Sequence, residues 1–253
     1  MSIAANLDRL RERMARAASR AGRRSEEITV VAVSKTFPAS AIREAYDAGV
    51  RHFGENRVQE WETKQPQLTD LRDSCWHLVG HLQRNKARRA AELFHRIDSV
   101  DSPVLAQRLV RAQYEVAEAR HLRSLFTARP ETLPRESEIP PPVPLPVLVE
   151  VRLAPEETKS GVTEGDLPAL AEAIRALPEL DLRGLMAIPP FFEDPELARP
   201  FFRALRELRD ALAARLARPL PALSMGMSHD FEVAVEEGAT EVRLGTAIFG
   251  SRA

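Results

Sequence analysis

The chain has 253 residues, of which 44% are hydrophobic and 29% are charged. This is enough for one large core and is close to the usual length of an α/β barrel. The formal net charge of -1 provides no field that would attract nucleic acid or an anionic membrane surface.

The amino-terminal segment and the cysteine content indicate a cytoplasmic protein. Charged residues interrupt the apolar positions of residues 1–20, so this segment does not resemble a signal peptide. No uncharged apolar run is long enough to cross a bilayer. Cys75 is the only cysteine, which excludes an internal disulfide.

Lysine is rare in this chain. Only four of the 36 basic residues are lysines, namely Lys35, Lys64, Lys86 and Lys159. Such a bias toward arginine suggests that a remaining lysine has a role that requires an amine. Schiff-base formation is one such role, because a guanidinium does not lose its proton. The alternative is that these four lysines have no special role and simply remain in a composition that favours arginine.

Strands and helices alternate along the sequence. Apolar, β-branched runs predict strands at 28–35, 52–56, 75–82, 96–101, 146–153, 182–189, 221–228 and 241–250. Helical patterns predict a first helix at 2–22 and a helix after each strand up to the seventh. We therefore expect a single (β/α)8 TIM-type barrel over residues 1–253, with an extra N-terminal helix. A doubly wound sheet is the rival, but no GxGxxG motif follows the first strand.

A proline-rich segment interrupts this alternation. Residues 127–146 contain seven prolines, too many for a helix or a central strand. We interpret it as a loop insertion on the amino-terminal face of the barrel, away from the site. A polyproline recognition motif is the alternative.

The carboxyl ends of the strands carry the candidate site, because active sites of such barrels lie there. Lys35 ends the first strand, where desolvation would make its amine nucleophilic. Glycines and hydroxyl residues follow the seventh and eighth strands, where these barrels often bind phosphate. Those residues are Ser224, Gly226, Ser228, Gly245 and Thr246, with Arg243 on the eighth strand as a further donor.

Several strings carry a family resemblance. They are VAVSK, FGENRVQE, WHLVGHLQRNK, KSG, GLMAIP, LSMGMSHDFEVAVEEG and VRLGTAIFG, and together they extend from about residue 28 to the carboxyl terminus. The chain thus resembles the pyridoxal phosphate homeostasis protein family, whose fold is that of the N-terminal barrel of alanine racemase.

The resemblance implies a site for pyridoxal 5'-phosphate (PLP). Lys35 would hold PLP as a Schiff base, Asn56 would lie beside the ring, and Arg243 would face the pyridine nitrogen. The phosphate would be held by Ser224, Gly226, Ser228, Gly245 and Thr246, while Met225 and Met227 would line the pocket. Lys86 and Lys159 also fall in family strings. Their side chains would either transfer PLP or form salt bridges. Arg152 and His81 depart from the family pattern.

The resemblance further implies a PLP carrier or buffer without dedicated catalysis, which passes PLP to apo-enzymes and is a monomer or weak dimer. The alternative is an amino-acid racemase or a related fold-type III enzyme. Racemisation needs a second base, which alanine racemase takes from an extra domain. The two tyrosines here, Tyr46 and Tyr114, fall in predicted helices.

Other chemistry finds less support. Cys75 begins a strand, on the face opposite to the expected site, so we predict a structural role. His77 and His81 lie in one predicted strand, where residues four apart are roughly 13 Å apart and cannot share a metal. We expect no metal site.

Overall fold

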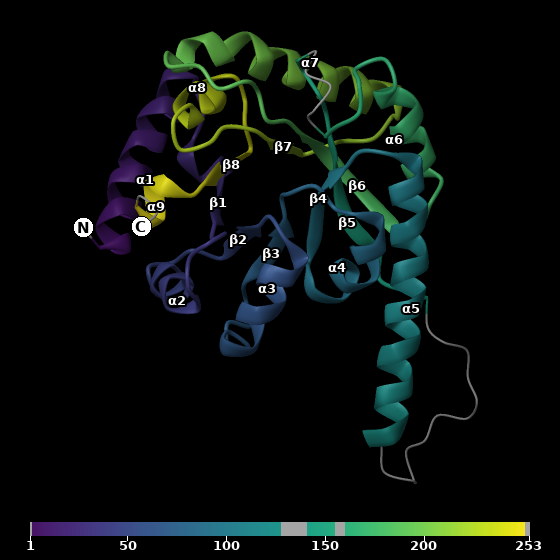
Figure 1. Ribbon diagram of the computed structural model, residues 1–253. Coiled ribbons are helices and arrows are strands. Elements are labelled where there is room, and N and C mark those ends of the chain that lie inside the picture. Colours follow the sequence, from purple (N-terminus) through teal and green to yellow (C-terminus); the bar gives the residue numbers. More distant parts are fainter. Residues whose placement is uncertain (1, 128–140, 155–159, 251–253) are drawn as a thin grey trace.

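Eight parallel strands close into a barrel in sequence order, as the sequence predicts (Figure 1). The computed structural model describes residues 2–127, 141–154 and 160–250. The strands are β1 (Thr29–Val33), β2 (His52–Glu55), β3 (Cys75–Leu78), β4 (Arg96–Val100), β5 (Leu145–Glu150), β6 (Leu180–Met186), β7 (Ala222–Ser224) and β8 (Glu241–Leu244). β1 pairs with both β2 and β8, which closes the barrel.

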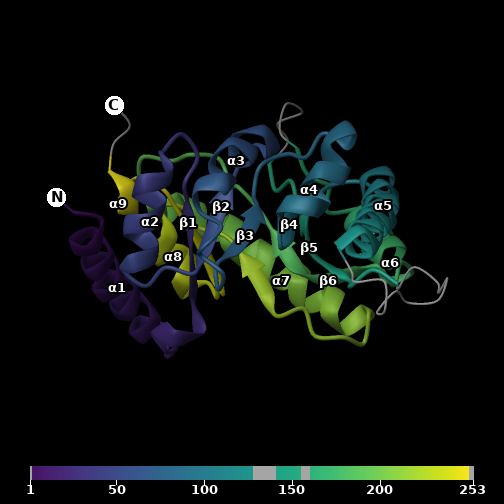
Figure 2. The ribbon, with the colours of Figure 1, turned by 90° about the horizontal axis from the view of Figure 1, so that it is seen from below.

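Helices surround the strands (Figure 2). They are α1 (Ile3–Arg20), α2 (Ala39–Asp47), α3 (Val58–Lys64), α4 (Ala87–Leu93), α5 (Pro103–Thr127), α6 (Leu167–Arg175), α7 (Arg199–Arg215), α8 (Phe231–Glu236) and α9 (Thr246–Phe249). α1 is the expected extra N-terminal helix. Its buried residues Ile3, Leu7, Leu10 and Met14 recur at helical spacing and pack into the core.

The predicted eighth strand is too long at its carboxyl end. Pairing stops at Leu244, and residues Thr246–Phe249 form α9 instead. Asn6 of α1 donates to Ile248 O at 2.8 Å, and Ile248 is fully buried. The apolar string therefore packs against α1 and does not extend the sheet.

Small residues let the strands approach inside the barrel. A Cβ at Gly184 would lie 1.8 Å from Ala222 O, so β6 and β7 approach as closely as they do only because Gly184 has no side chain. Leu148, Met186 and Ala222 fill the interior at this point as a separate buried cluster. The interior is thus a packed core, and a pocket can form only at its mouths.

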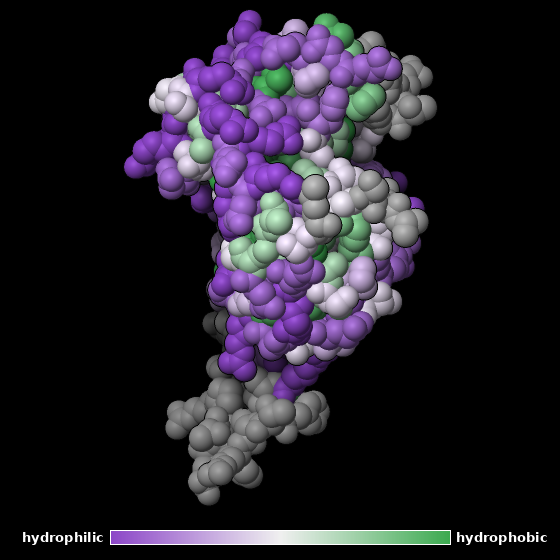
Figure 3. All heavy atoms as spheres, turned by 90° about the vertical axis from the view of Figure 1, so that its left-hand side faces the viewer, coloured by the Kyte–Doolittle hydropathy of each residue, from purple (hydrophilic) through white to green (hydrophobic). Residues whose placement is uncertain are grey.

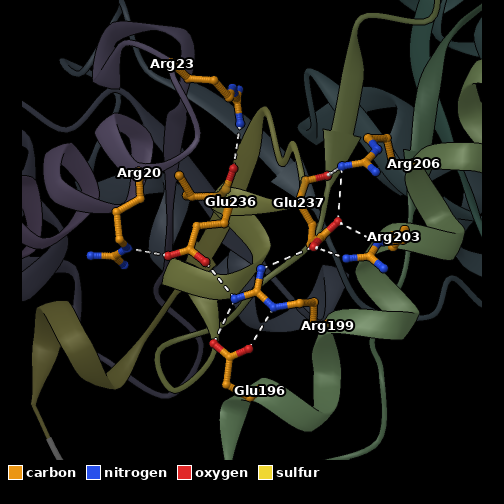
Figure 4. A network of polar contacts seen from close by, with 9 residues as sticks. Arg20, Arg23, Glu196, Arg199, Arg203, Arg206, Glu236 and Glu237 are labelled. Carbon is orange, nitrogen blue, oxygen red and sulfur yellow. Dashed lines mark hydrogen bonds and ion pairs between the residues drawn. The ribbon is translucent and has the colours of Figure 1, made fainter.

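Ion pairs join α7 to α8 and α8 to α1 (Figure 4). Glu237, just after α8, accepts from Arg199, Arg203 and Arg206 of α7. Glu236 accepts from Arg20 of α1. Some of the many arginines therefore stabilise the packing of the outer helices against one another.

α5 projects beyond the rest of the fold (Figure 1). Of the expected proline-rich loop at 127–146, residues 128–140 lie outside the described residues. Residues 141–144 lead into β5, which begins at Leu145, and Gln113 of α5 donates to Val143 O at 3.1 Å.

Hydrophilic residues dominate the upper part of the face that carries α1 (Figure 3). Within the described ranges, none of the helices has the length and apolar character needed to span a membrane.

Candidate functional site

A cavity of about 250 Å³ opens at the carboxyl ends of β1, β2 and β8. Its lining comprises Val33, Lys35, Phe37, Asn56, Val79, Ile188, Met227, Ser228, His229, Arg243, Gly245 and Thr246. Most of the residues expected from the sequence therefore meet in one cavity. Parallel strands bring this about because their carboxyl ends all lie at one mouth of the barrel.

The backbone on both sides of Lys35 is fixed by a buried network. Ser34 is fully buried, and its hydroxyl donates to Glu55 Oε1 at 2.8 Å. On the other side, the N–H of Thr36 donates to a Glu60 carboxylate oxygen. Thr36 has a φ of 70°, in the left-handed region that a β-branched residue rarely adopts. These contacts hold a strained turn that directs Lys35 into the cavity.

Lys64 joins the two carboxylates of this network. Its Nζ donates to Glu55 Oε1 at 2.9 Å, to Glu60 Oε1 at 2.7 Å and to Ser34 O at 2.9 Å. Burial raises the pKa of Glu55, and the hydrogen bond from Lys64 opposes this rise. Lys64 therefore has a structural role beneath Lys35, which its place in a predicted helix did not reveal.

Arg243 crosses the barrel mouth from β8. Its Nη1 donates to Ser224 Oγ at 2.8 Å and its Nη2 to Ala187 O at 2.9 Å. Only 4% of Arg243 is exposed, and burial lowers its pKa. Glu150, which ends β5, contributes an opposing negative charge. A guanidinium so held stays charged and fixed in orientation.

The loop after β7 is shaped by glycine and by side-chain hydrogen bonds. Gly226 has a φ of 89°, and a Cβ there would lie 2.6 Å from the Ala234 Cβ. The hydroxyl of Ser228 accepts from the N–H of Ala247 at 3.1 Å, which joins this loop to α9. The structure thus brings Ser228, Gly245 and Thr246 together in the lining of the cavity.

Three of the expected site residues lie behind the lining. Ser224 and Met225 are fully buried, Ser224 against Arg243 and Met225 in the main core. Gly226 accepts from the backbone N–H of Arg243 through its carbonyl at 2.9 Å. These residues support the cavity and do not line it, whereas Met227 lines it as expected.

The sequence did not predict several other residues of the site. Phe37 and His229 line the cavity from loops, where no periodic pattern marks them. Ile188 also lines it, just beyond β6, at the end of the strand predicted over 182–189. Glu150 is the one carboxylate in the otherwise apolar strand β5, and this contrast could have marked it in the sequence as a candidate site residue. Burial raises its pKa, and its Oε2 has no hydrogen-bond partner among the described residues.

The remaining residues that the sequence singled out lie elsewhere. Lys86 lines a neighbouring hollow that shares Asn56, and Lys159 lies outside the described residues. Arg152 follows β5 and lines a hollow with Glu150 and Ser160. His81 pairs with Asp101 at 3.2 Å, at the opposite end of β3 from Cys75.

Neither tyrosine lines the cavity. The hydroxyl of Tyr114 donates to Glu179 at 2.6 Å, and that of Tyr46 donates to Asp73. Both phenols are thus engaged with carboxylates away from Lys35.

Comparison with known proteins gives the family. The family model of the alanine racemase N-terminal domain matches residues 5–253. A curated relative from Aquifex aeolicus, named pyridoxal phosphate homeostasis protein, is 41% identical over 252 residues, covering 100% of this chain and 99% of its own. The chain belongs to the pyridoxal phosphate homeostasis protein family. The resemblance seen in the sequence is thereby confirmed.

Solved structures agree with this membership. PipY from Synechococcus elongatus, solved with PLP bound, is 38% identical, has a TM-score of 0.79, and covers 98% of this chain and 100% of its own. Alanine racemase from Corynebacterium glutamicum shares the fold, with a TM-score of 0.62 at 18% identity. This chain is covered to 97% by that enzyme but spans only 62% of it.

Proposed function

We propose that this protein binds PLP in the cavity at the carboxyl end of the barrel and serves cytoplasmic PLP homeostasis by storing and releasing it. The observation that carries the proposal is the convergence of Lys35, Arg243 and the loop residues Ser228 and Gly245 on one cavity. An amine fits an aldehyde, while hydroxyls, backbone N–H groups and a fixed cation fit a phosphorylated pyridine. The donor set therefore fits PLP.

Each residue has a distinct task in this proposal. Lys35 would hold the PLP aldehyde covalently as a Schiff base, and the network of Glu55, Glu60 and Lys64 keeps its backbone in place. Ser228, Gly245 and Thr246 would bind the phosphate, with Gly226 setting the course of the loop. Asn56 and Arg243 would contact the ring.

PLP supplies an electron sink for reactions at the α-carbon of amino acids when a protein provides acid and base groups around it. Arg243 would leave the ring nitrogen unprotonated, because a guanidinium only donates hydrogen bonds. Tyr46 and Tyr114 are engaged at other sites and offer no second base. We therefore propose a non-catalytic carrier whose recipients are PLP-dependent apo-enzymes.

Absorbance spectroscopy with borohydride reduction tests the proposal. Reduction of the PLP-loaded protein should attach PLP irreversibly to the peptide that contains Lys35. Lys35→Ala and Lys35→Arg should both lose this attachment, because the arginine keeps the charge but not the reactive amine. Lys86→Ala is the control and should keep it. Covalent PLP on the Lys35→Arg protein would refute the assignment, and rapid alanine racemisation would refute the carrier role.

A further inference from the structure

The amino-terminal mouth of the barrel, opposite to the proposed PLP site, holds a cluster of metal-ligating side chains. His52, Cys75 and His77 each offer one ligand atom, and these atoms all lie within 4.8 Å of one another. His52 Nδ1 and His77 Nε2 are 3.0 Å apart. Contrary to the sequence-based expectation of a structural Cys75 and no metal site, we infer that these three residues form a zinc site.

The strand register brings the three residues together. β2 and β3 pair with His52 beside Cys75 and Gly54 beside His77. Alternate residues of a strand share one face, so His52 lies on the face of Gly54, and Cys75 and His77 on the face of Val79. A Cβ added to Gly54 would contact the side chains of Val31, Val33 and Val79, so this face of β2 points toward side chains of β1 and of the residue just after β3 inside the barrel. That face is the barrel interior, so the three ligands converge inside the mouth.

The ligand set suits zinc in both chemistry and size. Thiolate and imidazole are ligands that zinc prefers, and three of them leave the fourth tetrahedral position for water. Tetrahedral bonds of about 2.0–2.3 Å separate the ligand atoms by roughly 3.3–3.7 Å. The observed nitrogen separation of 3.0 Å needs only a few tenths of an ångström of adjustment. On binding, the Cys75 thiol would release its proton to solvent. The hydrogen bond between His52 Nδ1 and His77 Nε2 would break, and its proton would move to solvent or to His52 Nε2. The sulfur and the two nitrogens would each replace one zinc-bound water.

An outer carboxylate already orients one of the ligands. His77 Nδ1 lies 3.3 Å from Asp98 Oδ2, and both side chains are almost fully buried. This contact directs His77 Nε2 toward His52 and Cys75. Carboxylate–histidine–zinc arrangements of this kind fix the tautomer of the ring and strengthen the metal bond.

The local charges also favour a divalent cation. Arg96 pairs with Asp98 at 2.6 Å and with Glu241, so one guanidinium faces two carboxylates. Asp98 would offset part of the charge of a bound zinc ion through its contact with His77. His52 and Cys75 are only partly buried, which leaves a path for the ion to enter.

Cobalt substitution and metal analysis test the site on the purified, PLP-loaded full chain. Because Cys75 is the only cysteine, any thiolate-to-cobalt absorption must come from it. We expect one zinc or cobalt ion per chain, with the visible cobalt bands of a tetrahedral site. Cys75→Ser should lose the thiolate absorption. His52→Ala should lower zinc affinity by more than the about 10–100-fold typical of outer-shell changes.

His95→Asn is the matched control, because this exposed histidine lies just before β4 at the same end of the barrel. The asparagine oxygen can still accept the hydrogen bond that His95 Nδ1 accepts from the N–H of Trp76 at 3.0 Å. This variant should bind zinc like the wild type. PLP content should be unchanged in all variants, so the outcome is separate from that of the proposed function. Failure of the wild type to bind stoichiometric zinc would overturn the inference. So would equal zinc affinity in the wild type, Cys75→Ser and His52→Ala, which would reveal adventitious binding only. Circular dichroism on each variant separates loss of a ligand from loss of the fold.

Discussion

The guanidinium of Arg243 donates to the hydroxyl of Ser224 across the β7–β8 pair at 2.8 Å, inside the barrel mouth. A second bond to Ala187 O, just after β6, makes Arg243 a bridge between three strands. Ser224, which the sequence predicts as a phosphate contact, accepts the first of these bonds and so helps to orient the cation that lines the cavity.

Arg243→Gln should weaken PLP binding by about 10- to 100-fold, the usual effect of losing a charge-assisted hydrogen bond. If Arg243 contacts the ring nitrogen, deuterium exchange into alanine per bound PLP should also rise, because the amide oxygen would accept a proton from that nitrogen. If Arg243 grips the phosphate, only affinity should fall. Arg243→Glu is a poorer test, since Glu150 and Asp230 would then face another carboxylate. Unchanged affinity and unchanged exchange would argue against both roles.

Lys64→Met should destabilise the fold by about 3–5 kcal/mol, because it leaves the buried Glu55 carboxylate without its cation. The double variant Lys64→Met with Glu55→Gln should recover part of this loss by removing the stranded charge. Lys86→Met, a lysine outside any buried pair in the described part of the chain, should change stability by less than about 0.5 kcal/mol. Urea unfolding measures all three. A small effect of Lys64→Met would mean that the network beneath Lys35 is solvated.

Replacing residues 129–139 with a short Gly-Ser linker should leave PLP affinity nearly unchanged. The segment connects α5 to the amino-terminal end of β5, whereas the cavity lies at the carboxyl ends of the strands. Residues 141–144 should be kept, because Val143 O accepts from Gln113. Fluorescence titration with PLP measures the affinity. A large loss would place the insertion in the binding site.

The sequence was sufficient to predict the barrel and the position of Lys35 at its carboxyl mouth, because β-branched runs and a strand-end lysine are local patterns. It was insufficient wherever a contact depends on register. Lys64 was placed in a helix, but only tertiary packing brings it under Ser34 and Glu55. His52 and Cys75 are far apart in the chain and become neighbours only through the β2–β3 pairing. The predicted carboxyl end of the eighth strand was also wrong. The apolar residues around Ile248 fit the buried face of a short helix as well as they fit a strand, so their pattern did not distinguish the two.

Two buried carboxylates should affect the pH dependence of stability with opposite signs. Burial raises the pKa of Glu150 above its ordinary value of 4.5, so the folded state binds more protons than the unfolded state. Its contribution to stability is present at low pH and is lost as pH rises from about 4.5 through the folded pKa. For Glu237, burial is outweighed by hydrogen bonds from Arg203 and Arg199, and the pKa is lowered. Its contribution is present above about 4.5 and is lost as pH falls through the folded pKa.

Glu150→Gln should therefore raise the Tm at neutral pH and have little effect in acid, since the neutral amide mimics the protonated acid. Glu237→Gln should lower the stability by about 1–3 kcal/mol at neutral pH, because three arginines lose the carboxylate charge and one of its two acceptor oxygens (Figure 4). That loss should shrink in acid and in high salt, where the wild-type pairs are already weakened. Thermal unfolding across pH, without added PLP, compares the two variants with the wild type. If both substitutions moved the Tm in the same direction at neutral pH, the opposite roles of burial and ion pairing at these two sites would be disproved.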